Sequence, residues 1–220
     1  MSVEGMVEGV KIKVCGLTRL SDARNAAAMG ADFLGFIFYP KSPRCLALNE
    51  YQMFQSELPD LPKVAVTVLP DSDQLNALLQ AGFDYYQIHF PLTGPYRQQI
   101  EEWSRQVNPE KLWLAQKVGP EDKFDETLIP YANTFLWDTY QKGAFGGTGK
   151  VGDWEGFEQV SRKSPDKNWV LAGGLNPGNV LEAIEKTGAK QVDLNSGVEK
   201  SPGVKDLNKL EQVRIVLQNT

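Results

Sequence analysis

Two side chains that lie far apart in the sequence could act as a base and an acid on a small substrate. Cys15 ends the apolar run 11–16 (KIKVCG), and Asp138 ends the apolar run 134–139 (TFLWDT). Lys13 lies two residues before Cys15 on the same strand face, where its positive charge would favour the reactive thiolate. A carboxyl group in apolar surroundings has a raised pKa and can donate a proton near neutral pH. The alternatives are a buried structural cysteine and an aspartate that caps a turn.

Two glycine-containing segments, AGGLNPGNV and NSGVEKSPGVKD, could bind a phosphate group. Glycines allow a ligand to approach the backbone, and an Asn-Pro pair followed by a helix is typical of a helix start. Phosphate groups bind the free N–H groups at such places. The alternative is that the glycines only form tight turns. The candidate phosphate-binding residues are Gly173, Gly174, Asn195, Ser196 and Gly197.

Three further features lie near the expected site. His89 is the sole histidine and ends an apolar run, so we expect a structural residue or a substrate contact rather than a partner in a Cys–His nucleophile pair. The loop 145–154 (FGGTGKVGDW) suggests a mobile lid, with a functionless loop as the alternative. It lacks the spacing of a P-loop. Cys45 is expected to be a bystander.

Eight apolar, strand-like runs alternate with helical segments, and this order must position the candidate residues. The expected strands are 11–16, 33–39, 63–69, 85–90, 112–118, 134–139, 169–173 and 191–195. The expected helices are 21–30 with Ser21 as N-cap, 47–57, 71–82, 95–107, a short and weak 124–131, 154–163, 177–187 and 206–218.

Strict alternation predicts a parallel sheet, and eight units predict an α/β fold of the single-domain (β/α)8 TIM-barrel type. No G-x-G-x-x-G follows the first strand, which argues against an open dinucleotide-binding sheet. We expect residues 10–220 to form the barrel domain and residues 1–9 a flexible tail. Working residues of such barrels lie at the carboxyl ends of the strands, where the candidate residues above would meet.

The composition narrows the class of protein. The chain has 220 residues, of which 41% are hydrophobic, and a formal net charge of −5 without a block of like charges. This balance argues against nucleic-acid binding. Two cysteines are too few for a disulfide framework, and the sequence contains neither a signal-peptide pattern nor an apolar run of membrane-spanning length. We therefore expect a cytoplasmic protein without membrane contact.

Several motifs, in order along the chain, resemble those of the phosphoribosylanthranilate isomerase family. They are KVCGLTR, FYPKSPR, LWDTY with FGGTGKVGDW, LAGGLNPGNV and DLNSGVEKSPGVKD. The resemblance implies a (β/α)8 barrel that performs an Amadori rearrangement in tryptophan biosynthesis, without metal or cofactor. It implies that N-(5′-phosphoribosyl)anthranilate becomes 1-(2-carboxyphenylamino)-1-deoxyribulose 5-phosphate. Members of the family are monomers or homodimers.

The resemblance also implies the residue roles. Cys15 would be the general base and Asp138 the general acid. Arg44 would bind the anthranilate carboxylate as a planar two-point partner. Asp193 would contact substrate or orient a catalytic group. The phosphate would lie on backbone N–H groups around Gly174 and the turn that starts at Asn195.

Two positions depart from the family pattern. Phe90 stands where glycine is usual and would narrow the rim, and Asn195 stands where a serine is common, so its amide N–H would replace a hydroxyl. Two rival interpretations stay open. One is the related aminoaldose isomerase of histidine biosynthesis, or an enzyme with both activities. The other is a phosphate-binding barrel that has lost catalysis.

Overall fold

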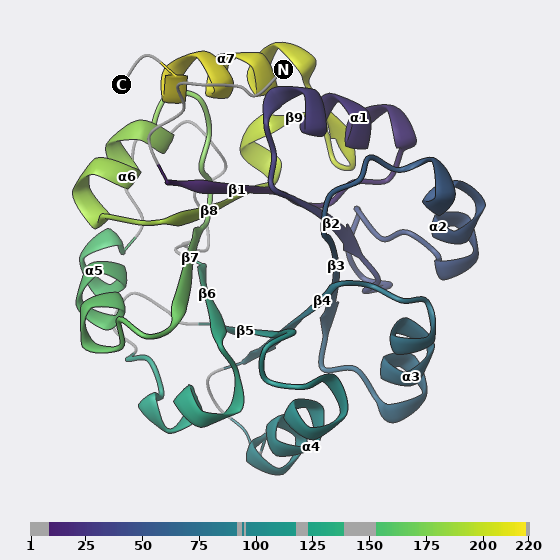
Figure 1. Cartoon of the computed structure of the whole chain (residues 1–220), viewed down its shortest axis with the longest axis vertical. Coiled ribbons are helices and arrows are strands. Elements are labelled where there is room, and N and C mark those ends of the chain that lie inside the picture. Colours follow the sequence, from purple (N-terminus) through teal and green to yellow (C-terminus); the bar gives the residue numbers. More distant parts are fainter. Residues whose placement is uncertain (1–8, 92–93, 95, 118–122, 139–152, 219–220) are drawn as a thin grey trace.

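The chain folds into a closed barrel of eight parallel strands in the order β1 to β8, with helices outside it (Figure 1). The computed structural model describes residues 9–91, 94, 96–117, 123–138 and 153–218. Strand β1 pairs in parallel with both β2 and β8, which closes the barrel. The strands are β1 Lys11–Val14, β2 Phe33–Ile37, β3 Lys63–Val68, β4 Tyr85–Pro91, β5 Leu112–Lys117, β6 Thr134–Asp138, β7 Asn168–Ala172 and β8 Gln191–Leu194. The predicted (β/α)8 fold is confirmed.

A helical segment follows each strand, and after β8 a 3-10 turn and a hairpin come before the last helix. The helices are α1 Leu20–Met29, α2 Leu48–Phe54 with the 3-10 turn η1 Gln55–Glu57, α3 Ser72–Gln80, α4 Arg97–Val107, the 3-10 helix η2 Glu126–Tyr131, α5 Trp154–Lys163, α6 Val180–Thr187 and α7 Leu207–Gln218. The weak fifth helix is the 3-10 element η2. It contains Pro130, which has no backbone N–H to donate.

An aspartate side chain caps the start of three helices, α3, α5 and α7. Asp71 accepts a hydrogen bond from the Gln74 N–H (2.8 Å) at the start of α3. The prediction of Ser21 as a cap is wrong, because α1 begins at Leu20 after an extended Arg19 without a side-chain cap. The helix start predicted at Asn176 and Pro177 is wrong as well, because α6 begins at Val180 after Asn179. Asn176 instead closes a turn before the helix, where its Oδ1 accepts a hydrogen bond from the Gly178 N–H (2.9 Å).

The strand pleat divides the apolar residues into two clusters. Residues two apart on a strand face the same side. One cluster fills the inside of the barrel and includes Cys15, Phe33 and Trp113. The larger cluster packs the outside of the strands against the helices and includes Trp137 and Phe157. Asp138 follows Trp137 and therefore lies on the inner face.

A short antiparallel hairpin interrupts the barrel pattern after β8. It consists of β9 Glu199–Ser201 and β10 Val204–Lys205, and it follows the 3-10 turn η3 Ser196–Val198. The sequence analysis assigns no helix or strand between strand 191–195 and helix 206–218, so this hairpin was not predicted. It contains two buried charged residues, Glu199 and Lys205.

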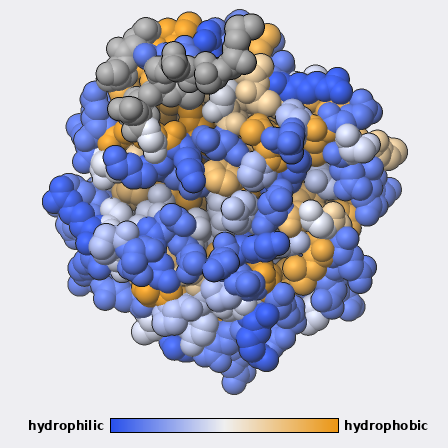
Figure 2. Space-filling model, viewed as in Figure 1, coloured by the Kyte–Doolittle hydropathy of each residue, from blue (hydrophilic) through white to orange (hydrophobic). Residues whose placement is uncertain are grey.

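Hydrophilic residues cover most of the face shown in Figure 2, with apolar residues in small groups between them. Among the described residues, no helix combines the length and the apolar character needed to cross a membrane. The expected tail 1–9 lies outside the described residues except for Gly9, and the expected lid 145–154 lies outside them except for its last two residues.

Candidate active site

A pocket of about 620 Å³ lies at the carboxyl ends of the strands and brings together most of the predicted site residues. Cys15 reaches it directly after β1, and Asp138 reaches it at the end of β6. Cys15 is buried and Asp138 is partly exposed. The other predicted residues that line the pocket are Arg44, His89, Gly173, Gly174, Asp193, Asn195 and Ser196.

A buried ion pair lies beside the thiol. Lys13 Nζ donates to both carboxylate oxygens of Asp193 at 3.0 Å, and the Lys13 side chain is fully buried. Burial lowers the pKa of Lys13, but the charges of Asp193 and Cys15 and the hydrogen bonds to them together outweigh burial and raise that pKa. Asp193 is thus the ion-pair partner of Lys13, the β1 side chain that places a positive charge beside Cys15.

The thiol itself does not follow the sequence expectation. Burial raises the pKa of Cys15 above its usual value, and the charge of Lys13 only partly offsets this. The expectation of an acidified thiol in the resting pocket is therefore wrong, because desolvation outweighs one nearby ammonium group that is already paired with Asp193.

His89 is neutral in the pocket. Burial, together with the charge of Lys13, lowers the pKa of His89 to about 4. Its Nε2 lies 2.7 Å from Gln87 Nε2, and since an amide nitrogen can only donate, His89 Nε2 accepts. The ring can contact a substrate at its remaining N–H but adds no charge above pH 5.

Arg44 is held by a carboxylate that the sequence interpretation did not single out. Arg44 Nη2 lies 2.7 Å from Glu199 Oε2, and Arg44 Nε lies 3.0 Å and 3.1 Å from the two oxygens. Lys205 Nζ also donates to Glu199, at 2.9 Å. The signal that could have found Glu199 is its place within the strand-eight motif.

The two glycine loops behave differently. Gly173 and Gly174 have positive φ values of 98° and 66°, and no heavy atom lies within 4 Å of a Cβ built on Gly174, so the backbone there is open to a ligand. Gly197 is not among the residues that line the pocket. A Cβ on Gly197 would lie 2.0 Å from the Leu175 oxygen, so this glycine lets the two loops approach each other.

The two departures from the family pattern have structural counterparts. Asn195 Oδ1 accepts from Lys205 Nζ (3.1 Å), which leaves the Asn195 amide N–H groups as donors. Phe90 lines the pocket but is buried, with its ring 6.4 Å from the Trp103 ring on α4. This contact draws Phe90 toward the helix layer rather than the rim.

Further residues around this pocket were not predicted. Gly16 has a φ of 71°, and a Cβ there would meet Asn195 Oδ1 at 2.6 Å and Arg44 Cδ at 2.8 Å, so only glycine leaves room for both side chains. Lys117, at the end of β5, adds an exposed cation to the lining.

Within the described part of the chain, no group of three or more His, Cys, Asp or Glu side chains could hold a metal ion. Cys45 is partly buried and is not among the pocket residues.

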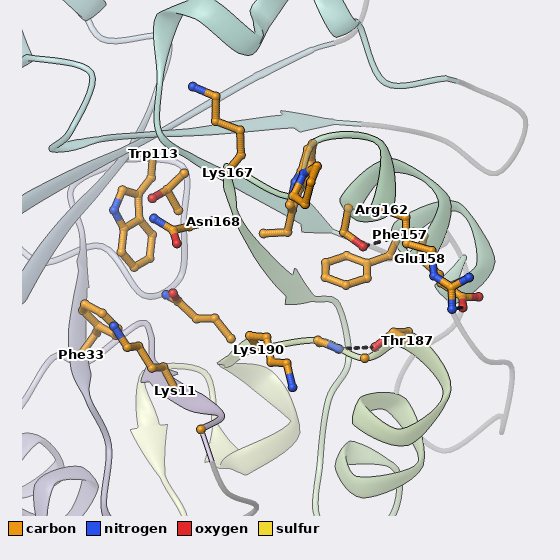
Figure 3. A pocket seen from close by; sticks show the side chains of 18 of the residues that line it. Lys11, Phe33, Trp113, Phe157, Glu158, Arg162, Lys167, Asn168, Thr187 and Lys190 are labelled. Atoms are coloured by element: carbon orange, nitrogen blue, oxygen red, sulfur yellow. Dashed lines mark hydrogen bonds and ion pairs between the residues drawn. The ribbon is translucent and has the colours of Figure 1, made fainter.

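A second hollow, of about 670 Å³, opens at the opposite, amino-terminal ends of the strands. Figure 3 shows Phe33, Trp113 and Lys11 facing it from strands, and Glu158 and Arg162 from α5. Trp113 and Phe33 meet edge to face, with ring centroids 5.3 Å apart. None of the predicted site residues lines this hollow.

Comparison with known proteins agrees with the geometry. Residues 12–215 match the family model described as N-(5′-phosphoribosyl)anthranilate (PRA) isomerase. The N-(5′-phosphoribosyl)anthranilate isomerase of Zymomonas mobilis is 34% identical over 209 residues, which cover 92% of this chain and 95% of that protein. The phosphoribosyl anthranilate isomerase of Thermotoga maritima superimposes with a TM-score of 0.75 at 29% identity, covering 96% of this chain and all of that one.

A second solved structure shows such an isomerase in complex with reduced 1-(o-carboxyphenylamino)-1-deoxyribulose 5-phosphate. It superimposes with a TM-score of 0.71 at 28% identity, covering 96% of this chain and all of that one. The family match spans nearly the whole barrel, including both strands that carry Cys15 and Asp138. The chain belongs to the phosphoribosylanthranilate isomerase family.

Proposed function

We propose that this chain converts N-(5′-phosphoribosyl)anthranilate into 1-(2-carboxyphenylamino)-1-deoxyribulose 5-phosphate, a step of tryptophan biosynthesis. The observation that carries the proposal is the presence of Cys15 and Asp138 in one pocket, from strands β1 and β6 of the barrel. An aldose–ketose isomerisation needs one group that donates a proton and one that removes a proton from carbon, and the pocket supplies both types.

Asp138 acts as the general acid. Its carboxyl group gives a proton to the furanose ring oxygen, the bond between that oxygen and C1′ breaks, and the nitrogen lone pair forms a cationic Schiff base. Asp138 sits at the inner edge of an apolar strand, partly removed from water. This position suits a carboxyl group that must hold its proton until substrate binds.

Cys15 acts as the general base. Its thiolate, formed when the thiol gives its proton to solvent, removes the C2′ proton, and the electrons neutralise the Schiff base to give an enolamine. Protonation at C1′ and loss of the C2′ hydroxyl proton then yield the ketose. Because burial raises the pKa of Cys15, the thiolate needs additional positive charge. Lys13 supplies part of it, and the cationic Schiff base supplies more, so ring opening prepares the base for the next step.

The remaining contacts hold the two charged ends of the substrate. The anthranilate carboxylate binds Arg44, and the phosphate binds the backbone around Gly174, Asn195 and Ser196. Asp193 keeps Lys13 in place beside the thiol. His89 contacts substrate as a neutral ring. No metal or cofactor enters this scheme, since the aniline nitrogen carries the charge of the intermediate.

The test is the loss of phosphoribosylanthranilate fluorescence on addition of the purified protein. Rapid decay that depends on enzyme concentration supports the proposal. Parallel assays with the aminoaldose of the histidine pathway decide between this reaction and its rival. Turnover of the histidine intermediate alone would refute the assignment, and tight binding of the reduced product without any turnover would favour a barrel that has lost catalysis.

We propose further that the enzyme works in the cytoplasm as a monomer or homodimer on a free phosphorylated small molecule, with neither nucleic acid nor membrane as a partner. The acidic balance of the chain and the membrane-span result for the described helices support this. Sedimentation equilibrium of the purified protein would decide between the two assembly states.

A further inference from the structure

Glu199 is a buried carboxylate at the start of β9 for which the reaction scheme has no role. It is 6% exposed. It accepts hydrogen bonds from the Arg44 guanidinium, from the Gly203 N–H at 3.1 Å and from Lys205 Nζ at 2.9 Å. A buried charge costs free energy unless it is paired, and here two cations and a backbone donor pair it.

The guanidinium group of Arg44 has two edges that can each donate a pair of hydrogen bonds, and Glu199 occupies one of them. A guanidinium carries five N–H donors in one plane. The edge formed by Nε and Nη2 faces Glu199. Among the described residues, the side-chain hydrogen bonds of Arg44 all go to Glu199 from this edge, and Nη1 makes none. Because Arg44 lines the pocket, the second edge is the one available to a substrate carboxylate.

Lys205 extends the same network to the other end of the substrate. Its side chain is fully buried, and its Nζ donates to Glu199, to Asn195 Oδ1 at 3.1 Å and to the Asn195 carbonyl at 3.3 Å. Asn195 begins the turn that contributes to the expected phosphate site. Glu199 therefore lies between the group that meets the carboxylate and the turn that meets the phosphate.

The electrostatics agree with a permanently ionised carboxylate. Burial alone would raise the pKa of Glu199, but the hydrogen bonds and charges of Arg44 and Lys205 together outweigh burial and lower that pKa. Without Glu199, two cations would face each other across a buried space. Arg44 would then be free to turn its side edge toward solvent or substrate.

We propose that Glu199 is a positioning residue: by occupying one edge of Arg44 it fixes the other edge for the substrate carboxylate, and through Lys205 it holds that edge at a set place relative to the Asn195 turn. This inference rests on the proposed function. It makes Glu199 a determinant of specificity for a substrate with an aromatic carboxylate.

The experiment compares two ligands on the variant Glu199→Gln, which keeps the shape of the side chain and removes its charge. One ligand is reduced 1-(o-carboxyphenylamino)-1-deoxyribulose 5-phosphate, and the other is the same compound without the ring carboxylate. Calorimetry should show about a 10-fold or greater loss of affinity for the first ligand and less than about a 3-fold change for the second. In an Arg44→Ala background, Glu199→Gln should cause little additional loss for the first ligand.

Equal weakening of both ligands would show a merely structural role and overturn the inference, as would wild-type affinity for the first ligand. Glu199→Asp keeps the charge but shortens the side chain, and it should recover part of the lost affinity. Glu199→Asp is also the variant to measure if Glu199→Gln does not fold.

Glu57→Gln is the matched control, because Glu57 pairs with Arg24 on the exposed surface. If wild-type protein neither binds the first ligand nor turns over substrate, the proposed function fails. If wild type does both and Glu199→Gln equals it, only this inference fails.

Discussion

The two ends of the barrel carry hollows of similar volume, about 620 Å³ and 670 Å³, but they hold their charged groups differently. At the carboxyl end, the lining residue Asp193 is at least nine-tenths buried, and so are three charged residues that contact the lining, Lys13, Glu199 and Lys205. At the amino end, the charged lining residues are exposed or partly exposed. Burying a charged side chain costs free energy, so buried charges are retained mainly where they take part in chemistry or binding. The volume of a hollow therefore does not distinguish the catalytic end of this barrel from the opposite end. The burial of charged side chains does.

This contrast divides the effects of substitutions. Changes at the carboxyl end should reduce activity while the fold survives. Changes at the amino end should reduce stability while the chemistry survives. The five substitutions that follow run from the largest expected effect to the smallest.

Asp138→Asn should give the largest loss. An amide cannot donate the proton that opens the furanose ring, so kcat should fall by about 10³-fold or more. The measurement is the fluorescence assay, with the melting temperature as the control for folding. Activity close to wild type would remove Asp138 from the mechanism.

Cys15→Ser should reduce kcat by about 10³-fold, because a serine hydroxyl is a far weaker base than a thiolate. The change is nearly isosteric, so stability should shift by less than about 1 kcal/mol. Cys45→Ser is the matched control, since Cys45 lies outside the pocket, and it should retain full activity. If Cys45→Ser proved to be the inactive variant, the base would be misassigned.

Trp113→Ala tests the opposite end. Trp113 is buried inside the barrel against Phe33 and Tyr85. The cavity should lower the free energy of unfolding by about 3 kcal/mol. At temperatures where the variant is folded, kcat and KM should stay within about 2-fold of wild type. Urea unfolding and steady-state kinetics check both parts, and a large loss of kcat with unchanged stability would break the comparison between the two ends.

Arg44→Ala should raise KM by about 30-fold, close to 2 kcal/mol, with a much smaller effect on kcat. The reason is that the carboxylate contact exists in both the ground state and the transition state. Initial rates over a range of substrate concentrations separate the two parameters. A fall in kcat at constant KM would instead place Arg44 in the transition state alone.

His89→Gln should change how stability depends on pH. The unfolded chain takes up a proton on His89 near pH 6.5, whereas the folded protein does so only near its pKa of about 4. The unfolded state therefore binds more protons between these values, and the wild type loses stability as pH falls from about 6.5 to 4. His89 is the sole histidine, so the variant should lose about 1–2 kcal/mol less between pH 7 and pH 5. Urea unfolding at both pH values checks this, and identical losses would contradict the lowered pKa.

The strands and most helices could be predicted because each is a local pattern. The run at β3 is apolar and β-branched, and α5 begins after Asp153, whose side chain accepts from the Gly156 N–H. The fifth helix was read as weak, and the 3-10 conformation with Pro130 agrees with that. The hairpin β9–β10 was missed because its two strands are only three and two residues long. Such short strands leave no periodic signal.

The candidate site was less predictable than the fold, for a physical reason. Strand ends identify which residues share a pocket, and that rule placed Cys15 and Asp138 together. The position of a residue at a strand end does not show which charged side chains form ion pairs with one another. The spacing of Lys13 and Cys15 suggested an acidified thiol, but Lys13 is already paired with Asp193, 180 residues away, and burial prevails. Glu199, 155 residues from Arg44, escaped notice for the same reason.

The buried, protonated state of Cys15 affects how readily oxidants damage the protein. Hydrogen peroxide and similar oxidants attack thiolates, and the first product is a sulfenic acid. A cysteine whose proton is retained until the cationic Schiff base forms offers such oxidants little to attack. The chain can therefore keep a redox-sensitive atom at its centre and still remain chemically intact between turnovers.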